Sequence, residues 1–210
     1  FLVVRCSPIF EYSQFAMNLV AIIGMVTAMF AASVALVQND IKKIIAYSTC
    51  SQLGYMFFAA GIGAYHIAMF HLFTHAFFKA LLFLGAGSVI HSFQDEQDIT
   101  KMGGVWKKIP YTMVLMLIGT LALTGFPFLS GFYSKDAIIE FAYLKNTSVG
   151  YYVSTIGIFT AFLTAIYSWR LFFKTFFGSY NNKSIPIEKT HEAPMIMIIP
   201  LIILAIGALF

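Results

Sequence analysis

Charged residues are scarce in this sequence. Only 10% of the 210 residues are Asp, Glu, Lys or Arg, whereas 60% are hydrophobic and the mean hydropathy is +0.82. A water-soluble domain usually carries about 25% charged residues. The shortage therefore excludes an ordinary soluble protein and indicates an integral membrane protein.

Cysteine is also nearly absent. Cys6 and Cys50 are far apart and match no metal-binding or redox spacing, so we expect free thiols with a structural role. The chain has no initiator Met, and it begins and ends inside apolar runs. We therefore expect a fragment of a longer chain, and no signal peptide is assigned.

Long apolar windows account for most of the chain. A helix needs about 20 apolar residues to cross a bilayer core, and five windows satisfy this wholly or nearly, at Ala16–Val37, Ile41–Ile62, Ile67–Ile90, Ile109–Leu144 and Tyr152–Phe177. A sixth begins near Ala193, and Phe1–Val4 has the composition of the end of an earlier span. Lipid cannot satisfy free backbone groups, so we predict an all-α integral membrane bundle.

The basic residues indicate the orientation of these spans. When the connections are numbered alternately, nine of the 13 Lys and Arg residues fall on one side: Lys42, Lys43, Lys101, Lys107, Lys108, Arg170, Lys174, Lys183 and Lys189. Arg5 and Lys145 fall on the other side, and Lys79 and Lys135 remain in the membrane. The positive-inside rule places the richer side in the cytoplasm or the mitochondrial matrix. The net charge of +4 is thus a topology signal and does not indicate nucleic-acid binding.

The third predicted span carries His71, His75 and Lys79 at four-residue steps. Each step advances about 40° and 6 Å, so the three side chains form one slanting stripe roughly 12 Å long. A lysine at the centre of a span costs about 2.5–3.5 kcal/mol, and it should face protein or water. Histidine and a desolvated lysine can both change charge near neutral pH. The stripe predicts a proton relay, and the simpler alternative is a lysine that is only paired inside the bundle.

The fourth predicted span contains about 36 residues, or roughly 54 Å of helix, which is too long for one straight crossing. Gly125, Pro127 and Gly131 predict a break within it. A broken helix at membrane depth is tolerated where it packs in protein or lines a cavity, and it often marks an ion site. Lys135 lies just past the break, and Asp136 either tunes Lys135 or pairs with it locally.

Other polar side chains could contribute to such a path. The second span offers hydroxyl and amide groups that can hold water, at Ser48, Thr49, Ser51 and Gln52. The hairpin QNDIKK carries Asp40, Lys42 and Lys43, which either anchor the interface or form an inner entrance for protons. Glu140 is expected nearer the outer surface, in a solvated position.

Four stretches carry a family resemblance: DIKKIIAYSTCSQLGYM, FHLFTHAFFKALLFLGAGSVIH, DEQDITKMGG and GFPFLSGFYSKD. Together they resemble the ND5/NuoL family, the antiporter-like subunits of respiratory complex I, over nearly the whole chain. The resemblance implies one transmembrane domain over residues 1–210, with the second inverted repeat at about 16–177 and a further span at 193–210. The first repeat and the C-terminal lateral helix of the family lie outside this sequence.

The resemblance also implies roles for individual residues. Lys79 matches the central lysine of the family, His71 and His75 match its connecting histidines, and Lys135 matches the lysine of its broken helix, on the way to the outer side. The implied function is proton translocation within an NADH:ubiquinone reductase, driven by electron transfer elsewhere in the complex. The implied location is a bacterial inner membrane or the mitochondrial inner membrane.

The resemblance implies partners and cofactors as well. The expected neighbours are other membrane subunits, especially the ND4/NuoM-like one, and the lipid bilayer, with no nucleic acid. The complex uses NADH, FMN, iron–sulfur clusters and ubiquinone. This sequence has no glycine-rich nucleotide loop and no cysteine cluster, so we expect it to bind none of them itself.

Three other classes of protein fit the same motifs less well. A membrane zinc protease requires HExxH, whereas this chain has HLFTH. A haem-b electron carrier could use two histidines as axial ligands, but two histidines one turn apart on one helix cannot flank a single haem. The closest alternative is the large subunit of an Mrp-type sodium/proton antiporter or of a related membrane-bound hydrogenase complex; HAFFKALLF, DEQDITKMGG and FYSKD favour complex I.

Overall fold

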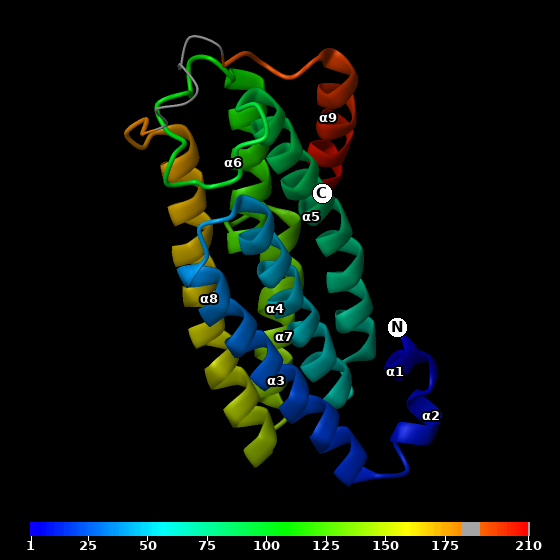
Figure 1. The fold of residues 1–210 in the computed structure, drawn as a ribbon. Coiled ribbons are helices and arrows are strands. Elements are labelled where there is room, and N and C mark those ends of the chain that lie inside the picture. Colours follow the sequence, from blue (N-terminus) through cyan, green and yellow to red (C-terminus); the bar gives the residue numbers. More distant parts are fainter. Residues whose placement is uncertain (182–189, 210) are drawn as a thin grey trace.

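The computed structural model describes residues 1–181 and 190–209, and within them the regular structure is helical apart from one isolated bridge (Figure 1). Its helices are α1 (Leu2–Arg5), α2 (Ser7–Phe10), α3 (Gln14–Val37), α4 (Ile41–Gly61), α5 (Tyr65–Ser92), α6 (Pro110–Thr124), α7 (Ser130–Leu144), α8 (Ser148–Phe176) and α9 (Met195–Leu209). The predicted all-α fold is confirmed. Two of the basic residues used for orientation, Lys183 and Lys189, lie outside the described residues.

The long helices alternate in direction along the bundle, except that α7 continues in the direction of α6 (Figure 1). The C-terminal ends of α3, α5 and α8 therefore lie toward one end of the bundle, which we call the inner end in keeping with the charge-based prediction. Within the described residues, α3, α5 and α8 are long and apolar enough to cross a membrane. The more polar α4 has 21 residues, and α6 and α7 have 15 each.

The predicted break in the fourth span is present between α6 and α7. Gly125 adopts φ +78° at the end of α6, a left-handed conformation that glycine tolerates without strain, and Pro127 follows in the connection. Gly131 was predicted to be part of the break, but this is wrong, because it lies in the first turn of α7. A Cβ atom at Gly131 would lie 1.9 Å from the carbonyl oxygen of Ala122, so its role is to let α7 approach α6.

Small residues hold α3 against α4. A Cβ at Gly54 would lie 2.7 Å from the carbonyl oxygen of Gly24, and a Cβ at Gly24 would lie 2.8 Å from that of Gly54. The buried face of α3 is otherwise almost entirely alanine. Close backbone approach through small residues is the usual way in which helices associate in lipid. The outward faces instead expose large apolar side chains such as Phe30, Phe162 and Ile203.

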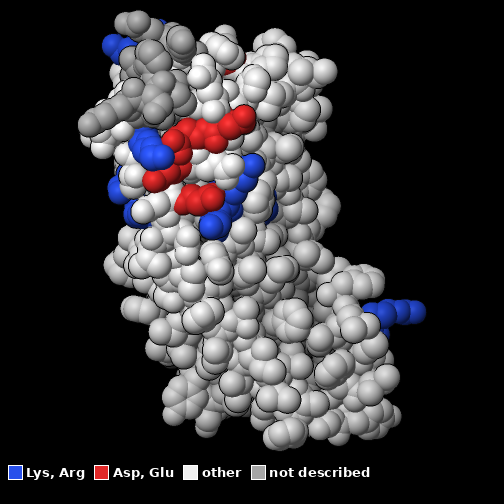
Figure 2. All heavy atoms as spheres, in the orientation of Figure 1, with Lys and Arg blue, Asp and Glu red and all other residues white. Residues whose placement is uncertain are grey.

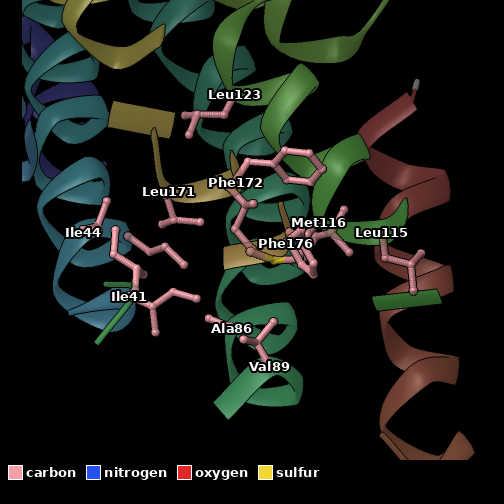
Figure 3. Close-up of a cluster of buried hydrophobic side chains, with 14 of the residues drawn as sticks. Ile41, Ile44, Ala86, Val89, Leu115, Met116, Leu123, Leu171, Phe172 and Phe176 are labelled. Carbon is pink, nitrogen blue, oxygen red and sulfur yellow. The ribbon is translucent and has the colours of Figure 1, made fainter. Parts of the chain in front are cut away.

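Two buried apolar clusters divide the bundle along its length. The inner cluster includes Ile41, Ile44, Ala86, Val89, Leu115, Met116, Leu123, Leu171, Phe172 and Phe176 (Figure 3). The outer cluster includes Ala21, Ala28, Tyr55, Phe58, Ala68, Ile138 and Val153. Most of the buried polar side chains of α4, α5 and α7 lie between these two sets along their helices. The fold thus encloses a polar layer, with apolar packing on either side of it.

The inner end is tied together by its loops, and Figure 2 shows charged side chains gathered there on the visible face. Asp40 caps α4 by accepting hydrogen bonds from the backbone N–H groups of Lys42 and Lys43. Two backbone bonds join this hairpin to the loop at 93–109, from Ile41 N to Gln97 O (3.0 Å) and from Ile99 N to Asn39 O (2.9 Å). These bonds hold the hairpin against the loop at 93–109, and its predicted roles at the membrane interface or as a proton entrance stay predictions.

Two further interactions fix the inner loops. The Arg170 guanidinium on α8 donates to Gln38 O at 2.6 Å and to Asn39 Oδ1 at 2.5 Å. Lys101 forms an ion pair with Glu96 at 3.1 Å. Partial burial alone would raise the pKa of Glu96, but the hydrogen bonds from Lys101 and two backbone N–H groups outweigh it and hold that pKa below its usual value.

Candidate relay site

The predicted stripe lies on the interior face of α5. His71, His75 and Lys79 are 1%, 5% and 4% exposed, so none of them faces lipid or bulk solvent. The two histidine rings lie 6.0 Å apart between centroids. The structure therefore brings the three predicted side chains together inside the bundle, and it places Lys79 near the middle of the 28-residue helix.

Lys79 has a hydroxyl group as its neighbour. Its ammonium group donates to Ser48 Oγ on α4 at 2.5 Å, and Ser48 Oγ lies 2.6 Å from the Tyr167 hydroxyl on α8. A hydroxyl can accept from a charged lysine and can donate to a neutral one. This neighbour therefore suits both protonation states of Lys79, whereas a carboxylate would favour the charged one.

His71 connects three helices. Its Nδ1 lies 2.9 Å from Ser134 Oγ on α7, and its Nε2 lies 3.2 Å from Gln52 Oε1 on α4. With the Gln52 oxygen accepting, the neutral ring carries its hydrogen on Nε2, and Nδ1 is an acceptor. The Ser134 hydroxyl also lies 3.1 Å from Ser130 O, so its one hydrogen is shared between these two acceptors. Thr74 adds a further hydroxyl, 2.9 Å from Ser134.

Lys135 lies on α7 beside this network and is 3% exposed. Its ammonium nitrogen lies 5.4 Å from the centroid of the Tyr55 ring, within the range of a cation–π interaction. The Tyr55 hydroxyl in turn donates to Gly157 O at 2.5 Å, which fixes the ring. Tyr55 therefore supplies a polarisable neighbour for Lys135 that carries no formal charge.

The buried layer contains no carboxylate among the described residues. Asp136 is exposed on α7, and with Glu140 it borders an open groove between α7 and α8. Within the described chain the ion pair at 4.0 Å or less is Lys101–Glu96, so local pairing of Asp136 with Lys135 is not observed. The two buried lysines are therefore held without a paired anion.

Several buried polar atoms in this layer lack a protein partner. Within the described residues they include Gln52 Nε2, His75 Nε2 and Lys135 Nζ. Buried groups of this kind are usually satisfied by ordered water. The arrangement can thus support a chain of hydrogen bonds in which side chains and water alternate.

Part of this site could be predicted from the sequence. Of the four polar residues of α4 expected to hold water, Ser48 bonds Lys79 and Gln52 bonds His71. Ser51 instead donates to Ala28 O on α3, and Thr49 bonds its own helix at Ile45 O. Their binding of water stays a prediction. Ser134, Tyr167 and Tyr55 were not predicted to belong to the site, although Ser134 directly precedes Lys135 in the sequence. No local pattern separates Tyr167 from the other aromatic residues of α8.

The histidines, cysteines and carboxylates of the chain are dispersed in the described structure. Among the described residues, no group of three or more His, Cys, Asp or Glu side chains is arranged to hold a metal ion.

A membrane-embedded helical bundle with a broken helix and buried lysines defines a protein of the antiporter-like class. Residues 1–165 match the family described as the transmembrane part of NADH:quinone oxidoreductase and Mrp antiporters. The chain belongs to this family.

Curated relatives match along the entire chain. It is 53% identical over 210 residues to NADH-ubiquinone oxidoreductase chain 5 of Marchantia polymorpha, covering 100% of this chain and 31% of the relative. It is 54% identical to NADH-quinone oxidoreductase subunit L of Rhodobacter capsulatus, covering 99% of this chain and 30% of that protein. The chain therefore spans about a third of the length of these relatives.

Two solved structures share the fold. A chain of the archaeal membrane-bound sulfane sulfur reductase matches with a TM-score of 0.83 and 29% identity, covering 92% of this chain and 32% of that one. A chain of the Mrp complex from Dietzia sp. matches with a TM-score of 0.79 and 27% identity, covering 91% of this chain and 21% of that one. The architecture is thus common to several membrane complexes of this family.

Proposed function

We propose that this chain is part of the proton-translocating membrane arm of an NADH:quinone oxidoreductase. The observation that carries the proposal is the pair Lys79 and Lys135, buried on separate helices with no buried carboxylate among the described residues. Structural lysines are normally paired when buried, so an unpaired arrangement indicates a charge that can be switched. The identity of more than 50% with chain 5 and subunit L supports the choice of complex.

In this proposal a proton passes between the two lysines through the histidines. The hydrogen bonds of His71 with Ser134 and Gln52 join α5 to α7 and α4, and His75 lies between His71 and Lys79 along α5. Like charges in one low-dielectric interior disfavour each other. Charging one lysine therefore promotes release of the proton from the other, which gives the transfer a direction once one end is driven.

The driving reaction would take place outside this chain. We assign NADH, FMN, iron–sulfur clusters and ubiquinone to other subunits, because this sequence has neither a glycine-rich nucleotide loop nor a cysteine cluster. The proposed partners are the other membrane subunits, including an ND4/NuoM-like neighbour, together with the lipid bilayer. Asp136, exposed on α7, would tune Lys135 from the groove side or contact such a partner.

The proposal is tested in the assembled complex with Lys79→Met and Lys135→Met, each of which keeps an apolar stem and removes the charge. Proton pumping in proteoliposomes should fall by about tenfold or more. Lys107→Met, at an exposed lysine of the inner loop, is the control and should pump normally. Assembly is checked on native gels and by NADH oxidation with a soluble electron acceptor. Unchanged pumping in both buried-lysine variants would contradict the proposal.

A sodium/proton antiporter is the second candidate, favoured by the structural match to the Mrp complex. The two functions differ in the ion and in its coupling. Transport that requires sodium, with no link to NADH oxidation, would support the antiporter. Proton pumping that depends on NADH and is indifferent to sodium would support the oxidoreductase.

A further inference from the structure

A small cavity adjoins Lys79 on the side away from the histidines. Its volume is about 10 Å³, roughly the least that admits one water molecule. Its polar lining consists of Ser48, Lys79, Thr120, Tyr167 and Ser168, and its other walls are apolar.

Three of these polar groups have unused hydrogen-bonding capacity. Lys79 has three N–H donors when charged, and its hydrogen bond to Ser48 uses one of them. Thr120 donates to Met116 O at 2.8 Å and keeps the lone pairs of its hydroxyl oxygen. Ser168 is 5% exposed, and its Oγ has no partner among the described residues. Ser48 and Tyr167, in contrast, are bonded to each other.

The cavity lies on the side of Lys79 that faces the inner end of the bundle. Leu82 lies about one turn from Lys79 toward the inner end of α5, and Leu171 lies about one turn from Ser168 in the same sense. His75 and His71 lie one and two turns from Lys79 toward the opposite end. Lys79 thus stands between the histidines and the cavity, and the inner cluster lies beyond the cavity.

We propose that this cavity binds a single water, held by Lys79, Ser168 and Thr120, and that this water delivers protons to Lys79 from the inner side. The inference rests on the proposed function and adds a site and a direction to it. In the step, neutral Lys79 takes a proton from the bound water, and the water takes one that further water molecules pass on from the inner side, where one hydronium ion becomes water. The water is unchanged and Lys79 gains one positive charge. Ser168 is a positioning residue, because it orients the water and exchanges no proton itself.

The test uses the assembled complex and Ser168→Ala, which removes the hydroxyl and adds almost no space. Ser154→Ala makes the same chemical change at another buried serine of α8, 4% exposed and more than three turns away, and serves as the control. Cryo-electron microscopy should show water density within hydrogen-bond distance of Lys79 and Ser168 in the unmodified complex. This density should be absent in Ser168→Ala.

Pumping is the second readout. Ser168→Ala should lower it by about tenfold, whereas Ser154→Ala should leave it unchanged. Ser168→Gly makes room for another water in place of the hydroxyl and should recover most of the activity, which a purely structural role of Ser168 would not allow.

The outcomes separate the two proposals. A dry cavity in the unmodified complex would overturn the water site. So would equal pumping by Ser168→Ala and Ser154→Ala, or equal loss in Ser168→Ala and Ser168→Gly; in these cases a loss in Lys79→Met would leave the proposed function standing. Normal pumping by both Lys79→Met and Lys135→Met would overturn the proposed function itself.

Discussion

Replacing Gly131 by alanine tests whether the close approach of α7 to α6 positions the buried layer. The new Cβ would lie 1.9 Å from Ala122 O, whereas an ordinary close C···O contact is about 3.3 Å, so α7 must move by roughly 1.4 Å. Ser134 lies one turn farther along α7, and its hydroxyl is 2.9 Å from His71 Nδ1. A displacement of this size directed away from His71 would stretch this distance to at most about 4.3 Å, beyond hydrogen-bond range.

Two effects on stability oppose each other in this variant. Overpacking costs about 1–3 kcal/mol, and the better helix propensity of alanine returns up to about 1 kcal/mol. The larger effect should be on function, because a displacement of about 1 Å in a proton-transfer geometry can lower a rate by about 10²-fold. Proton pumping by the reconstituted complex should therefore fall far more than its thermal stability does.

Gly87→Ala is the matched control for this experiment. It adds the same methyl group at a position away from the ends of α5, where no other atom outside the helix lies within 4 Å of the new Cβ. This variant should pump normally and be at least as stable as the parent. The reasoning is refuted if Gly131→Ala pumps as well as Gly87→Ala. It is also refuted if a structure of Gly131→Ala retains the hydrogen bond between His71 and Ser134 and pumping is nevertheless lost.

Three further predictions concern the inner end of the bundle, where one helix end and two connections are held by side chains. Glu192 accepts hydrogen bonds from the first turn of α6, including one of 2.9 Å from a backbone N–H. Glu192→Ala should lower the free energy of unfolding, measured by thermal denaturation, by about 0.5–2 kcal/mol. An unchanged free energy of unfolding would contradict the capping role. Arg170→Met should raise hydrogen exchange in the hairpin at 38–40, whereas unchanged exchange would show that the guanidinium is dispensable. Glu96 stabilises the loop at 93–109, and its pKa is lower in the folded protein than in the unfolded chain. This stabilisation should be fully present above the unfolded-state pKa of about 4.3, and it should be lost as the pH falls through the lower folded-state pKa. Exchange of the loop at 93–109 at pH 7, 5 and about 3.5, corrected for the intrinsic rate, checks this, and early loosening near pH 5 would contradict it.

The sequence was sufficient to predict the helical spans, because each depends on a local count of apolar residues. It also predicted the burial of Lys79 and Lys135, since a charge at that depth has few other places to lie. The partners of these lysines depend on how neighbouring helices are rotated against one another, which is why Tyr167 could not be identified. Gly131 was misplaced because a glycine that permits close packing and a glycine that ends a helix look the same in a sequence.

The division of the bundle into two apolar clusters has an electrical consequence. The stripe from His71 to Lys79 covers about 12 Å along α5, within a hydrocarbon layer of roughly 30 Å. Most of the membrane voltage should therefore drop across the apolar clusters, where moving one charge across the full potential takes about 2.3 kcal/mol per 100 mV. Voltage would then act mainly on proton entry and exit and only weakly on transfer along the layer. Pumping rates measured in proteoliposomes at several clamped potentials would test this; a rate-limiting step within the layer would show little dependence on voltage.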